Sequence, residues 1–371
     1  MESANIVIIG GGIIGMSVAA KLSENNDGVY VFERNSRLGQ EATSHNSGVI
    51  HSGIHYPNGS LKAELCVKGN SMLYDICGKY GIPHKRLGKL TVAIEEEEIG
   101  ELEKLEKQGT ENGVEGLRLM DGEEVKKMEP EVKAVRALLS PTTGIIEPDE
   151  LLNHFYARTR NNNGTIALGT MVSGIRKTDS GYEVRGSSAG EKFVIHARTV
   201  INCGGLNSDR IAEMAGIDID EQKYRIHFCK GDYFRVSGKA PVKRLVYPVP
   251  KGVGLGIHLT PDLAGSVKLG PNAYYVDDID YRVESSEIEF RKDVMRYLPR
   301  IKEMEIHEDS SGVRAKLQGP NDPFRDFVIR DEAELGLPGF VNLIGIDSPG
   351  LTASPAIAEF VSEIYENEIK S

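Results

Sequence analysis

Residues 5–15 of the chain read NIVIIGGGIIG, and this stretch decides the first part of the fold. A short apolar run, typical of a buried strand, leads directly into three glycines at the GxGxxG spacing. Apolar residues then recur at helical spacing through residues 14–22, and a second apolar run follows at residues 29–32. This order predicts a β–α–β unit over residues 5–33.

The residues of this unit have the chemistry of a dinucleotide site. Gly10 permits a tight turn, Gly12 lets the backbone approach a pyrophosphate, and Gly15 lets the helix pack closely on the strand. The amino-terminal end of the helix favours negative charge. Glu33 can accept hydrogen bonds from both hydroxyls of an adenosine ribose and would repel a 2′-phosphate. NADP is therefore disfavoured, whereas NAD and FAD share the adenosine half and both stay open.

The composition excludes several classes of protein. A chain of 371 residues favours one or two domains, and 40% hydrophobic and 27% charged residues are typical of a globular protein. The formal net charge of −11 argues against nucleic acid and against strong attraction to anionic lipid. No apolar run reaches the roughly 18 residues of a membrane span, and we expect no signal peptide.

The cysteines indicate the redox compartment. Cys66, Cys77, Cys203 and Cys229 are widely spaced and form no CxxC pair. This pattern fits buried thiols in a reducing cytoplasm better than a disulfide framework or a zinc site. We therefore predict a cytoplasmic protein and leave open a peripheral contact with a membrane.

Nucleotide-binding features recur far from the amino terminus. Residues 165–197 are strand-rich, residues 199–205 (TVINCGG) predict a buried strand running into a Gly-Gly turn, and residues 353–366 predict a helix. Residues 88–94 and 244–268 also have strand patterns. One nucleotide-binding domain assembled from separated segments, with a substrate domain inserted, explains this distribution better than two sequential domains.

A second stretch, residues 44–56 (SHNSGVIHSGIHY), places three histidines within eleven positions. His51 and His55 are four residues apart, which on a helix would let both bind one metal ion. The glycines and β-branched residues around them disfavour a helix, and in an extended chain the two would lie about 13 Å apart. We therefore predict no metal site. The small residues suit a backbone that passes close to a cofactor.

Four segments resemble one family. They are residues 45–70 (HNSGVIHSGIHYPNGSLKAELCVKGN), 229–234 (CKGDYF), 255–273 (LGIHLTPDLAGSVKLGPNA) and 311–319 (SGVRAKLQG). They are similar to the L-2-hydroxyglutarate dehydrogenase/oxidase group of FAD-dependent oxidoreductases. That group lies within the D-amino-acid-oxidase superfamily, beside FAD-linked glycerol-3-phosphate dehydrogenases and glycine oxidases. The similarity extends from about residue 4 to residue 360.

The resemblance implies an α/β fold with an α+β substrate part. We expect a Rossmann-like FAD/NAD(P)-binding domain with an inserted mixed-sheet substrate domain, and FAD as the cofactor. The FAD-binding domain would comprise residues 1–85, 140–215 and 312–371. The substrate-binding domain would comprise residues 86–139 and 216–311.

The resemblance also implies the residues that contact FAD. The ADP half would be held by Gly10, Gly12, Ile13, Ile14, Gly15, Glu33 and Arg34. The pyrophosphate and flavin would be approached by Ser44, Asn46, Ser47, Gly48 and Val49. The backbone of Val172 would bind adenine, and a second phosphate-side turn would be formed by Cys203, Gly204 and Gly205. Negative charge on the reduced flavin would be stabilised at the start of the last helix, by Gly350, Leu351 and Thr352.

Oxidation of a 2-hydroxy acid needs a cation for the carboxylate and a base for the hydroxyl proton. Arg314 is the expected carboxylate ligand, because a guanidinium binds carboxylate through two parallel hydrogen bonds and related flavoenzymes place an arginine there. His258 is the first choice for the base, since an unperturbed pKa near 6.5 suits proton abstraction around neutrality. An alternating strand would point it away from Ile257 and Leu259. His51 is the rival base or a hydrogen-bonding group at the flavin edge.

Tyr56, Lys62 and Lys230 are candidate ligands for a second, distal carboxylate. The expected reaction is oxidation of a short 2-hydroxy acid, L-2-hydroxyglutarate to 2-oxoglutarate, by hydride transfer to flavin N5. The alternatives are an FAD-dependent glycerol-3-phosphate dehydrogenase or an amino-acid or amine oxidase. A metal-binding protein that uses His45, His51 and His55 is the alternative from another class. The expected partners are a small carboxylate substrate and an electron acceptor: oxygen, a quinone or an electron-transfer protein.

Overall fold

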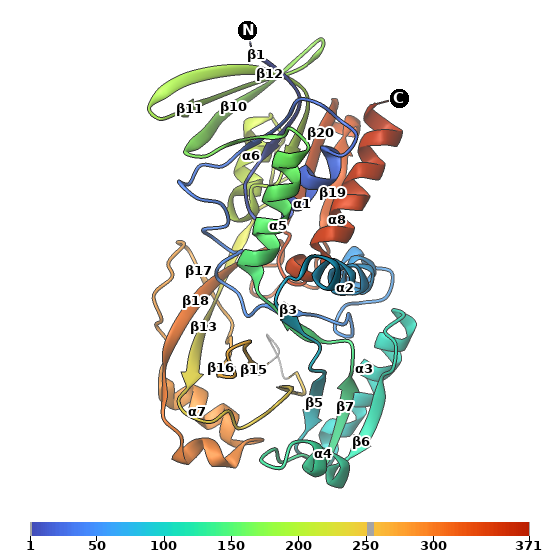
Figure 1. Cartoon of the computed structure of the whole chain (residues 1–371), viewed down its shortest axis with the longest axis vertical. Coiled ribbons are helices and arrows are strands. Elements are labelled where there is room, and N and C mark those ends of the chain that lie inside the picture. The colour runs from blue at the N-terminus through green and yellow to red at the C-terminus, as the bar shows by residue number, and fades with distance from the viewer. Residues whose placement is uncertain (1, 251–255, 371) are drawn as a thin grey trace. The chain divides into compact units, whose positions relative to one another are not determined.

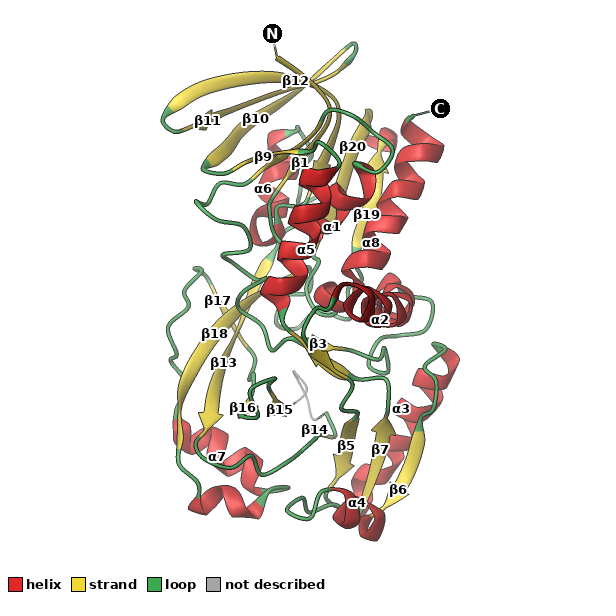
Figure 2. Ribbon diagram, viewed as in Figure 1, coloured by secondary structure: helices red, strands yellow, loops and turns green. Residues whose placement is uncertain are grey.

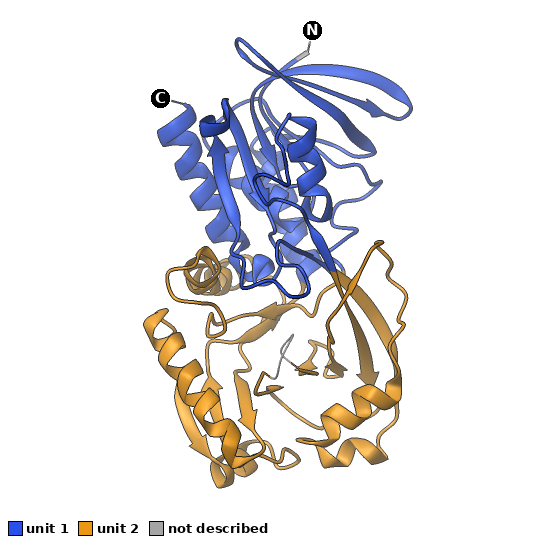
Figure 3. Cartoon of the chain, turned by 180° about the vertical axis from the view of Figure 1, so that it is seen from behind, with its two compact units in different colours: residues 1–44, 148–228, 314–371 blue, residues 45–147, 229–313 orange. Residues whose placement is uncertain are grey.

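The computed structural model describes residues 2–250 and 256–370. The chain divides into two compact units, which Figure 3 shows in different colours. Unit 1 comprises Met1–Ser44, Pro148–Phe228 and Arg314–Ser371, and unit 2 comprises His45–Glu147 and Cys229–Val313. Each unit is described by itself.

Unit 1 contains the β–α–β unit predicted at the glycine motif, together with further strands and helices. Its strands are β1 (Glu2–Ile9), β2 (Val29–Phe32), β9 (Thr165–Ala167), β10 (Thr170–Thr178), β11 (Gly181–Ser188), β12 (Glu191–Asn202), β19 (Val328–Glu332) and β20 (Leu337–Ile344). Its helices are α1 (Ile13–Leu22), α5 (Pro148–Asn161), α6 (Ser208–Met214) and α8 (Gly350–Ile364), which continues as a π turn, Tyr365–Ile369. Two 3₁₀ turns, Gly205–Asn207 and Ala333–Leu335, complete the unit.

The central strands of unit 1 form a parallel sheet in the order β20-β12-β1-β2-β9. Ile6, Val7 and Ile8 of β1 are fully buried, as expected for a parallel strand covered on both faces. Helix α1 contacts both α5 and α8 (Figure 1). The hairpin β10–β11 extends the first half of β12 in antiparallel order, and β19 pairs antiparallel with β20. This is the Rossmann-like arrangement that the sequence predicted.

Unit 2 combines a large mixed sheet with helices. Its strands are β3 (Val49–Ile50), β4 (His84–Lys85), β5 (Lys89–Ala93), β6 (Arg118–Asp121), β7 (Arg136–Ser140), β8 (Gly144–Ile146), β14 (Leu245–Pro248), β15 (Leu259–Pro261), β16 (Val267–Leu269) and β17 (Tyr274–Val276). Its helices are α2 (Leu61–Tyr80), α3 (Ile99–Glu111), α4 (Gly122–Met128) and α7 (Glu287–Met295), with 3₁₀ turns at Glu96–Glu98 and Pro299–Glu303. The unit boundary falls within β13 (His227–Val236) and β18 (Ile306–Lys316).

The large sheet has the order β17-β13-β16-β15-β14-β5-β7-β6, with β18 paired to β13 (Figure 2). Strand β14 is parallel to β5, while β15, β16, β7 and β6 pair antiparallel with their neighbours. The predicted mixed-sheet part is therefore present. A separate small sheet has the order β3-β8-β4. The predicted strand-rich segment 244–268 includes residues 251–255, which lie outside the described residues.

The unit boundaries differ from the predicted domain boundaries. Residues 45–85 and 140–147, predicted in the FAD-binding domain, belong to unit 2, and residues 216–228 belong to unit 1. The pairing of β3 with β8, and of β4 with β8, explains the first difference, because it ties the two segments to each other. The assignment of FAD binding to residues 1–85, 140–215 and 312–371 stays a prediction.

No helix in the described part of the chain is long and apolar enough to span a membrane.

Candidate functional site

The glycine motif forms a turn with no room for side chains. A Cβ atom on Gly10 would lie 2.2 Å from the carbonyl oxygen of Cys203, and Gly10 has a φ of +112°. A Cβ on Gly15 would lie 1.9 Å from the carbonyl oxygen of Gly10. The turn therefore keeps its backbone bare at the start of α1, which is what close approach of a pyrophosphate requires.

Two side chains hold this turn in place. The backbone N–H of Gly11 donates to Oε2 of Glu33 over 2.7 Å, and that of Ile13 donates to the hydroxyl of Thr43 over 2.9 Å. Oε1 of Glu33 accepts a further bond from the N–H of Asn35. A carboxylate has about four acceptor sites, so these bonds leave capacity for ribose hydroxyls. The ribose role of Glu33 stays a prediction.

Unit 1 brings three distant segments of predicted cofactor residues together. The N–H of Cys203 donates to the carbonyl of Ile9 over 2.9 Å, which sets residues 203–205 against the glycine turn. A Cβ on Gly350 would lie 3.8 Å from Cδ1 of Ile14, so the first turn of α8 is close to the first turn of α1. In that turn Thr352 is fully buried. The result is a cradle of backbone from residues 10–15, 203–205 and 350–352.

The remaining cofactor candidates of unit 1 lie outside this cradle's contacts. Arg34 is exposed and forms an ion pair with Glu41. Ser44 is exposed, and its N–H donates to the carbonyl of Gly39. Val172 is buried in β10, where the register with β11 shifts between Val172 and Gly174. Their roles in binding FAD stay predictions.

The first part of the histidine stretch has a structural role in unit 2. Nδ1 of His45 lies 2.9 Å from the carbonyl oxygen of Ser311, and its ring stacks on Tyr281 at a centroid distance of 3.9 Å. The side chain of Asn46 accepts a bond from the N–H of Gly48, whose φ is +61°. Val49 then enters β3, and Ser47 is half-buried. The roles of residues 46–49 toward FAD stay predictions.

The second part of the stretch is not extended, as we had expected, but forms a turn over residues 53–56. The turn brings His51 and His55 close enough to influence each other's charge. Nε2 of His55 lies 3.0 Å from Nζ of Lys89, a residue that is only 1% exposed. The extended-chain distance of the two histidines was therefore wrong. Even so, no group of three or more potential ligands for a metal ion is found among the described residues.

The charges of this cluster are strongly perturbed. Burial, and then the charge of Lys89, lower the pKa of His51 to about 3. The same causes, with His51 and His258 added, hold the pKa of His55 well below its ordinary value. Burial lowers the pKa of Lys89 to about 7. As whole residues, both histidines are half-buried.

His258 lies immediately before β15 rather than within a strand. Its ring is 7% exposed and stacks on Tyr247 with the centroids 3.5 Å apart and the planes 8° apart. Ile257 and Leu259 instead pack into the apolar core of unit 2. The predicted separation of His258 from its two neighbours is thus present, although the residue itself lies outside the strand.

The other substrate-site candidates have varied surroundings. Arg314 is half-buried on β18, between the buried Val313 and Ala315. Lys230 is fully buried and forms ion pairs with Glu284 at 3.1 Å and Asp280 at 3.7 Å. Because these carboxylates already compensate its charge, Lys230 is a weaker candidate than Arg314 for binding substrate.

The last two candidates for substrate binding, Lys62 and Tyr56, both lie in unit 2. Lys62 is 8% exposed on α2, and Tyr56 is half-buried, with its carbonyl oxygen accepting a hydrogen bond from Asn112. Their roles in substrate binding stay predictions.

Sequence reasoning missed two residues of these sites. Lys89 lies in a segment that has a strand pattern, at a polar position of the alternation, and no signal in that pattern showed that the position is buried. Thr43 lies in a polar loop with no motif, and no signal pointed to its bond with Ile13. His55, named from the sequence only as a candidate metal ligand, is the direct partner of Lys89.

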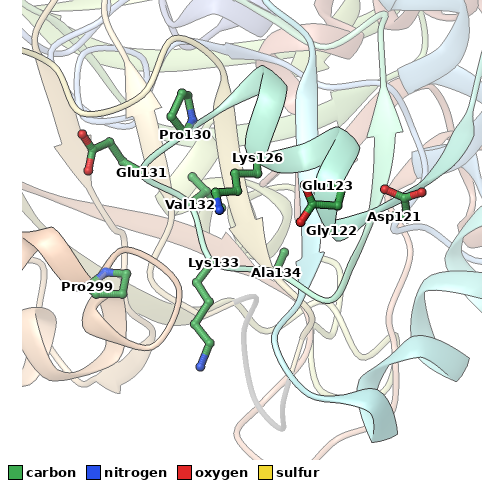
Figure 4. Close-up of a pocket in the computed structure, with 10 residues that line it drawn as sticks. All are labelled: Asp121, Gly122, Glu123, Lys126, Pro130, Glu131, Val132, Lys133, Ala134 and Pro299. Carbon is green, nitrogen blue, oxygen red and sulfur yellow. The ribbon is translucent and has the colours of Figure 1, made fainter.

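Unit 2 also has a surface pocket of about 530 Å³, distinct from all predicted site residues (Figure 4). Its lining residues are Asp121, Gly122, Glu123, Lys126, Pro130, Glu131, Val132, Lys133, Ala134 and Pro299. Asp121 caps α4 and Glu131 pairs with Arg300, so two of its acids have structural partners. We assign this pocket no function.

Comparison with known proteins places the chain in a class. The family model described as FAD dependent oxidoreductase matches residues 5–364. The chain belongs to this family and is an FAD-dependent oxidoreductase. FAD is its cofactor, and the bare backbone cradle of unit 1 fits the phosphates of such a dinucleotide.

Individual relatives show which members of the family the chain is similar to. The chain is 37% identical to mitochondrial L-2-hydroxyglutarate dehydrogenase of Arabidopsis thaliana, over 98% of this chain and 84% of that protein. It is 32% identical to glycerol 3-phosphate dehydrogenase of Caloramator mitchellensis, over 99% of this chain and 74% of that protein. A solved structure of dithionite-reduced L-alpha-glycerophosphate oxidase from Mycoplasma pneumoniae with FAD bound matches with a TM-score of 0.86 and 27% identity, over 99% of this chain and 95% of that chain.

Proposed function

We propose that the enzyme oxidises a short 2-hydroxy acid, L-2-hydroxyglutarate, to the 2-oxo acid, 2-oxoglutarate. The observation that carries this proposal is the 37% identity to a protein named L-2-hydroxyglutarate dehydrogenase over nearly the whole chain. The buried Lys89 of unit 2, which lies against His55, supports it, because an acidic substrate is favoured next to a lysine ammonium group.

Different residues would bind the substrate and accept its hydroxyl proton. When bound, FAD would supply the acceptor for a hydride from C2 of the substrate, and a side chain of this protein would take the proton of the substrate hydroxyl. Arg314 would bind the carboxylate beside C2 through two parallel hydrogen bonds. The product is the 2-oxo acid, so two electrons and two protons leave the substrate in total.

Two observations favour His51 over His258 as the base. Its lowered pKa keeps it uncharged at neutral pH, as a base must be before it accepts a proton, and the residue is half-buried rather than buried. His258 is buried face to face with Tyr247, which restricts its movement toward a substrate. We therefore prefer His51 and keep His258 as the alternative.

We propose that FAD binds at the backbone cradle of unit 1. The pyrophosphate would bind at the start of α1, between residues 10–15 and 203–205, with the adenosine ribose at Glu33. The first turn of α8, with Thr352, would stabilise negative charge on the flavin ring.

Anaerobic reduction of the bound flavin tests the substrate. The holoenzyme should lose its absorbance near 450 nm when mixed with L-2-hydroxyglutarate, and much more slowly with D-2-hydroxyglutarate, glycine or D-amino acids. Equal rates with all four compounds would refute the assignment of a 2-hydroxy acid substrate. A preparation that binds no FAD under any condition would contradict the cofactor sites above.

Glycerol 3-phosphate is the second candidate substrate, on the basis of the Caloramator relative. It belongs in the same experiment as a separate arm. If glycerol 3-phosphate alone reduced the flavin, this second function would replace the first.

The four cysteines support a reducing compartment, because they are buried and form no disulfide bond among the described residues. We propose the cytoplasm on this ground. The electron acceptor would be oxygen, a quinone or an electron-transfer protein, and reoxidation of the reduced flavin by each in turn distinguishes them.

A further inference from the structure

The mixed sheet of unit 2 has one apolar face and one face with polar groups at its centre. Leu90 and Val92 of β5 and Val246 of β14 point into the apolar core, together with Leu259. The intervening residues Lys89, Thr91 and Tyr247 are therefore on the opposite face, because successive side chains of a strand alternate. Register pairs Thr91 with Tyr247, and Val246 with Leu259, which places His258 beside Tyr247.

Lys89 is the centre of this polar face. Its Nζ lies 3.0 Å from Nε2 of His55 and 4.8 Å from the ring centroid of Tyr247. No carboxylate within residues 2–250 and 256–370 contributes to its charge state. Residues 251–255 (KGVGL) contain no acidic side chain either. A buried ammonium group is costly unless a negative charge compensates it.

A second polar group on the same face lacks a partner in the described part of the chain. Thr91 is fully buried, and its hydroxyl forms no hydrogen bond there. Buried hydroxyls are normally hydrogen-bonded, so an unsatisfied one two residues from Lys89 needs an explanation. An anion next to Lys89 would supply the acceptor.

We propose that Lys89, with His55 and Thr91, forms the subsite for the substrate carboxylate that is remote from the reacting carbon. The identity of this anion as a carboxylate of a 2-hydroxy dicarboxylate rests on the function proposed above. Lys89 is then a specificity-determining residue, because a 2-hydroxy acid with one carboxylate leaves its charge uncompensated.

Anion binding at Lys89 would also affect the base. The charge of Lys89 is one of the two causes that lower the pKa of His51. A bound carboxylate would offset that charge and oppose this part of the lowering, whereas burial, the larger cause, would remain.

The test uses Lys89→Met in the FAD-loaded enzyme, with Lys107→Met as control, since Lys107 is an exposed lysine of the same unit. Glutarate is the probe, because it has both carboxylates of the substrate but no hydroxyl to oxidise. Titration calorimetry should show glutarate binding about 10- to 100-fold weaker to Lys89→Met and unchanged to Lys107→Met. In turnover, the preference in kcat/KM for L-2-hydroxyglutarate over L-2-hydroxyvalerate should fall by a similar factor.

The wild-type enzyme gives a measurement that does not depend on the folding of a variant. Because the pKa of free Lys89 is about 7, binding of glutarate above pH 7 should take up a proton, seen as a dependence of the binding heat on the buffer. The other titratable groups around Lys89 are His51, His55, Cys66, Tyr247 and His258. In Lys89→Met the uptake should decrease.

The outcomes separate this proposal from the proposed function. Equal glutarate affinity of wild type and Lys89→Met, or no binding of glutarate by wild type, overturns the subsite. If glutarate binding depends on Lys89 but no 2-hydroxy acid reduces the flavin, the subsite is supported and the proposed function is refuted.

Discussion

At the scale of single residues, a methyl group on Gly10 would lie 2.2 Å from the carbonyl oxygen of Cys203, far inside contact distance. The φ of +112° adds strain for any other residue. We therefore expect Gly10→Ala to lose bound FAD and to destabilise the protein by more than about 2 kcal/mol. The ratio of absorbance at 450 and 280 nm, and urea unfolding, measure the two effects.

The control for this substitution is Gly78→Ala on α2, where a Cβ meets no atom within 4 Å. Alanine is the better helix former, so this variant should keep its flavin and gain up to about 1 kcal/mol. Full flavin content in Gly10→Ala would show that the turn is not part of the cofactor site.

Arg314 offers a second residue-scale prediction. Removal of a charge-assisted pair costs about 1.5–3 kcal/mol, so Arg314→Ala should lower kcat/KM for the substrate by about 10- to 150-fold while FAD stays bound. Steady-state kinetics measure this, with Arg185→Ala as control, since Arg185 is an exposed residue of unit 1. Unchanged kinetics in Arg314→Ala would remove its assigned role.

At the scale of elements, α2 follows directly from local rules. Ser60 adopts an extended conformation and its hydroxyl accepts a hydrogen bond from the N–H of Ala63, while Gly81 ends the helix in the left-handed conformation. Ser60→Ala should cost about 1 kcal/mol in the free energy of unfolding. Ser71→Ala, at an exposed position within α2, is the matched control and should be neutral or slightly stabilising. A loss in Ser71→Ala as large as in Ser60→Ala would contradict the cap.

Strand β5 shows where element-scale reasoning stops. The alternation of residues 88–94 predicted a strand, and the structure has it at Lys89–Ala93. All five residues are buried, however, so the pattern did not show that the polar face with Lys89 and Thr91 is covered as well. That depends on β14 and β15, more than 150 residues later in the sequence, which supply Tyr247 and the neighbour of His258.

At the scale of the whole molecule, the lowered pKa of His51 links folding to pH. The folded-state pKa is about 3 and the unfolded value is 6.5, so the unfolded chain binds the additional proton between these values. Stability is therefore lost as pH falls from 6.5 toward 3. His51 alone should contribute a loss of about 2 kcal/mol between pH 6.5 and 4.5, and His55 adds to it.

Urea unfolding at pH 6.5 and 4.5 measures this effect. His51→Gln should have a smaller difference in unfolding free energy between the two pH values than wild type has. His307→Gln is the control, because His307 is an exposed histidine. If His51→Gln loses as much stability on acidification as wild type, then His51 is not held neutral in the folded protein.

The sequence by itself determined the nucleotide-binding unit and its class of ligand. The GxGxxG turn, the strand before it and Glu33 after it are close in the chain, so local spacing contains the whole signal. Glycine is required there for steric reasons that hold in any protein with this turn. Residues 203–205 and 350–352 were assigned by resemblance, and the fold brings both to the same turn.

Only the tertiary structure decided that Lys89, His51 and His55 form a cluster in unit 2. Residues 53–56 form a turn where the local sequence predicted an extended chain, and this places His55 against Lys89. Burial then lowers the pKa values of both groups, an effect of surroundings contributed by strands far apart in sequence. Spacing along the chain fixes which residues can share a turn or a strand face, whereas charge and proton affinity depend on what packs around them.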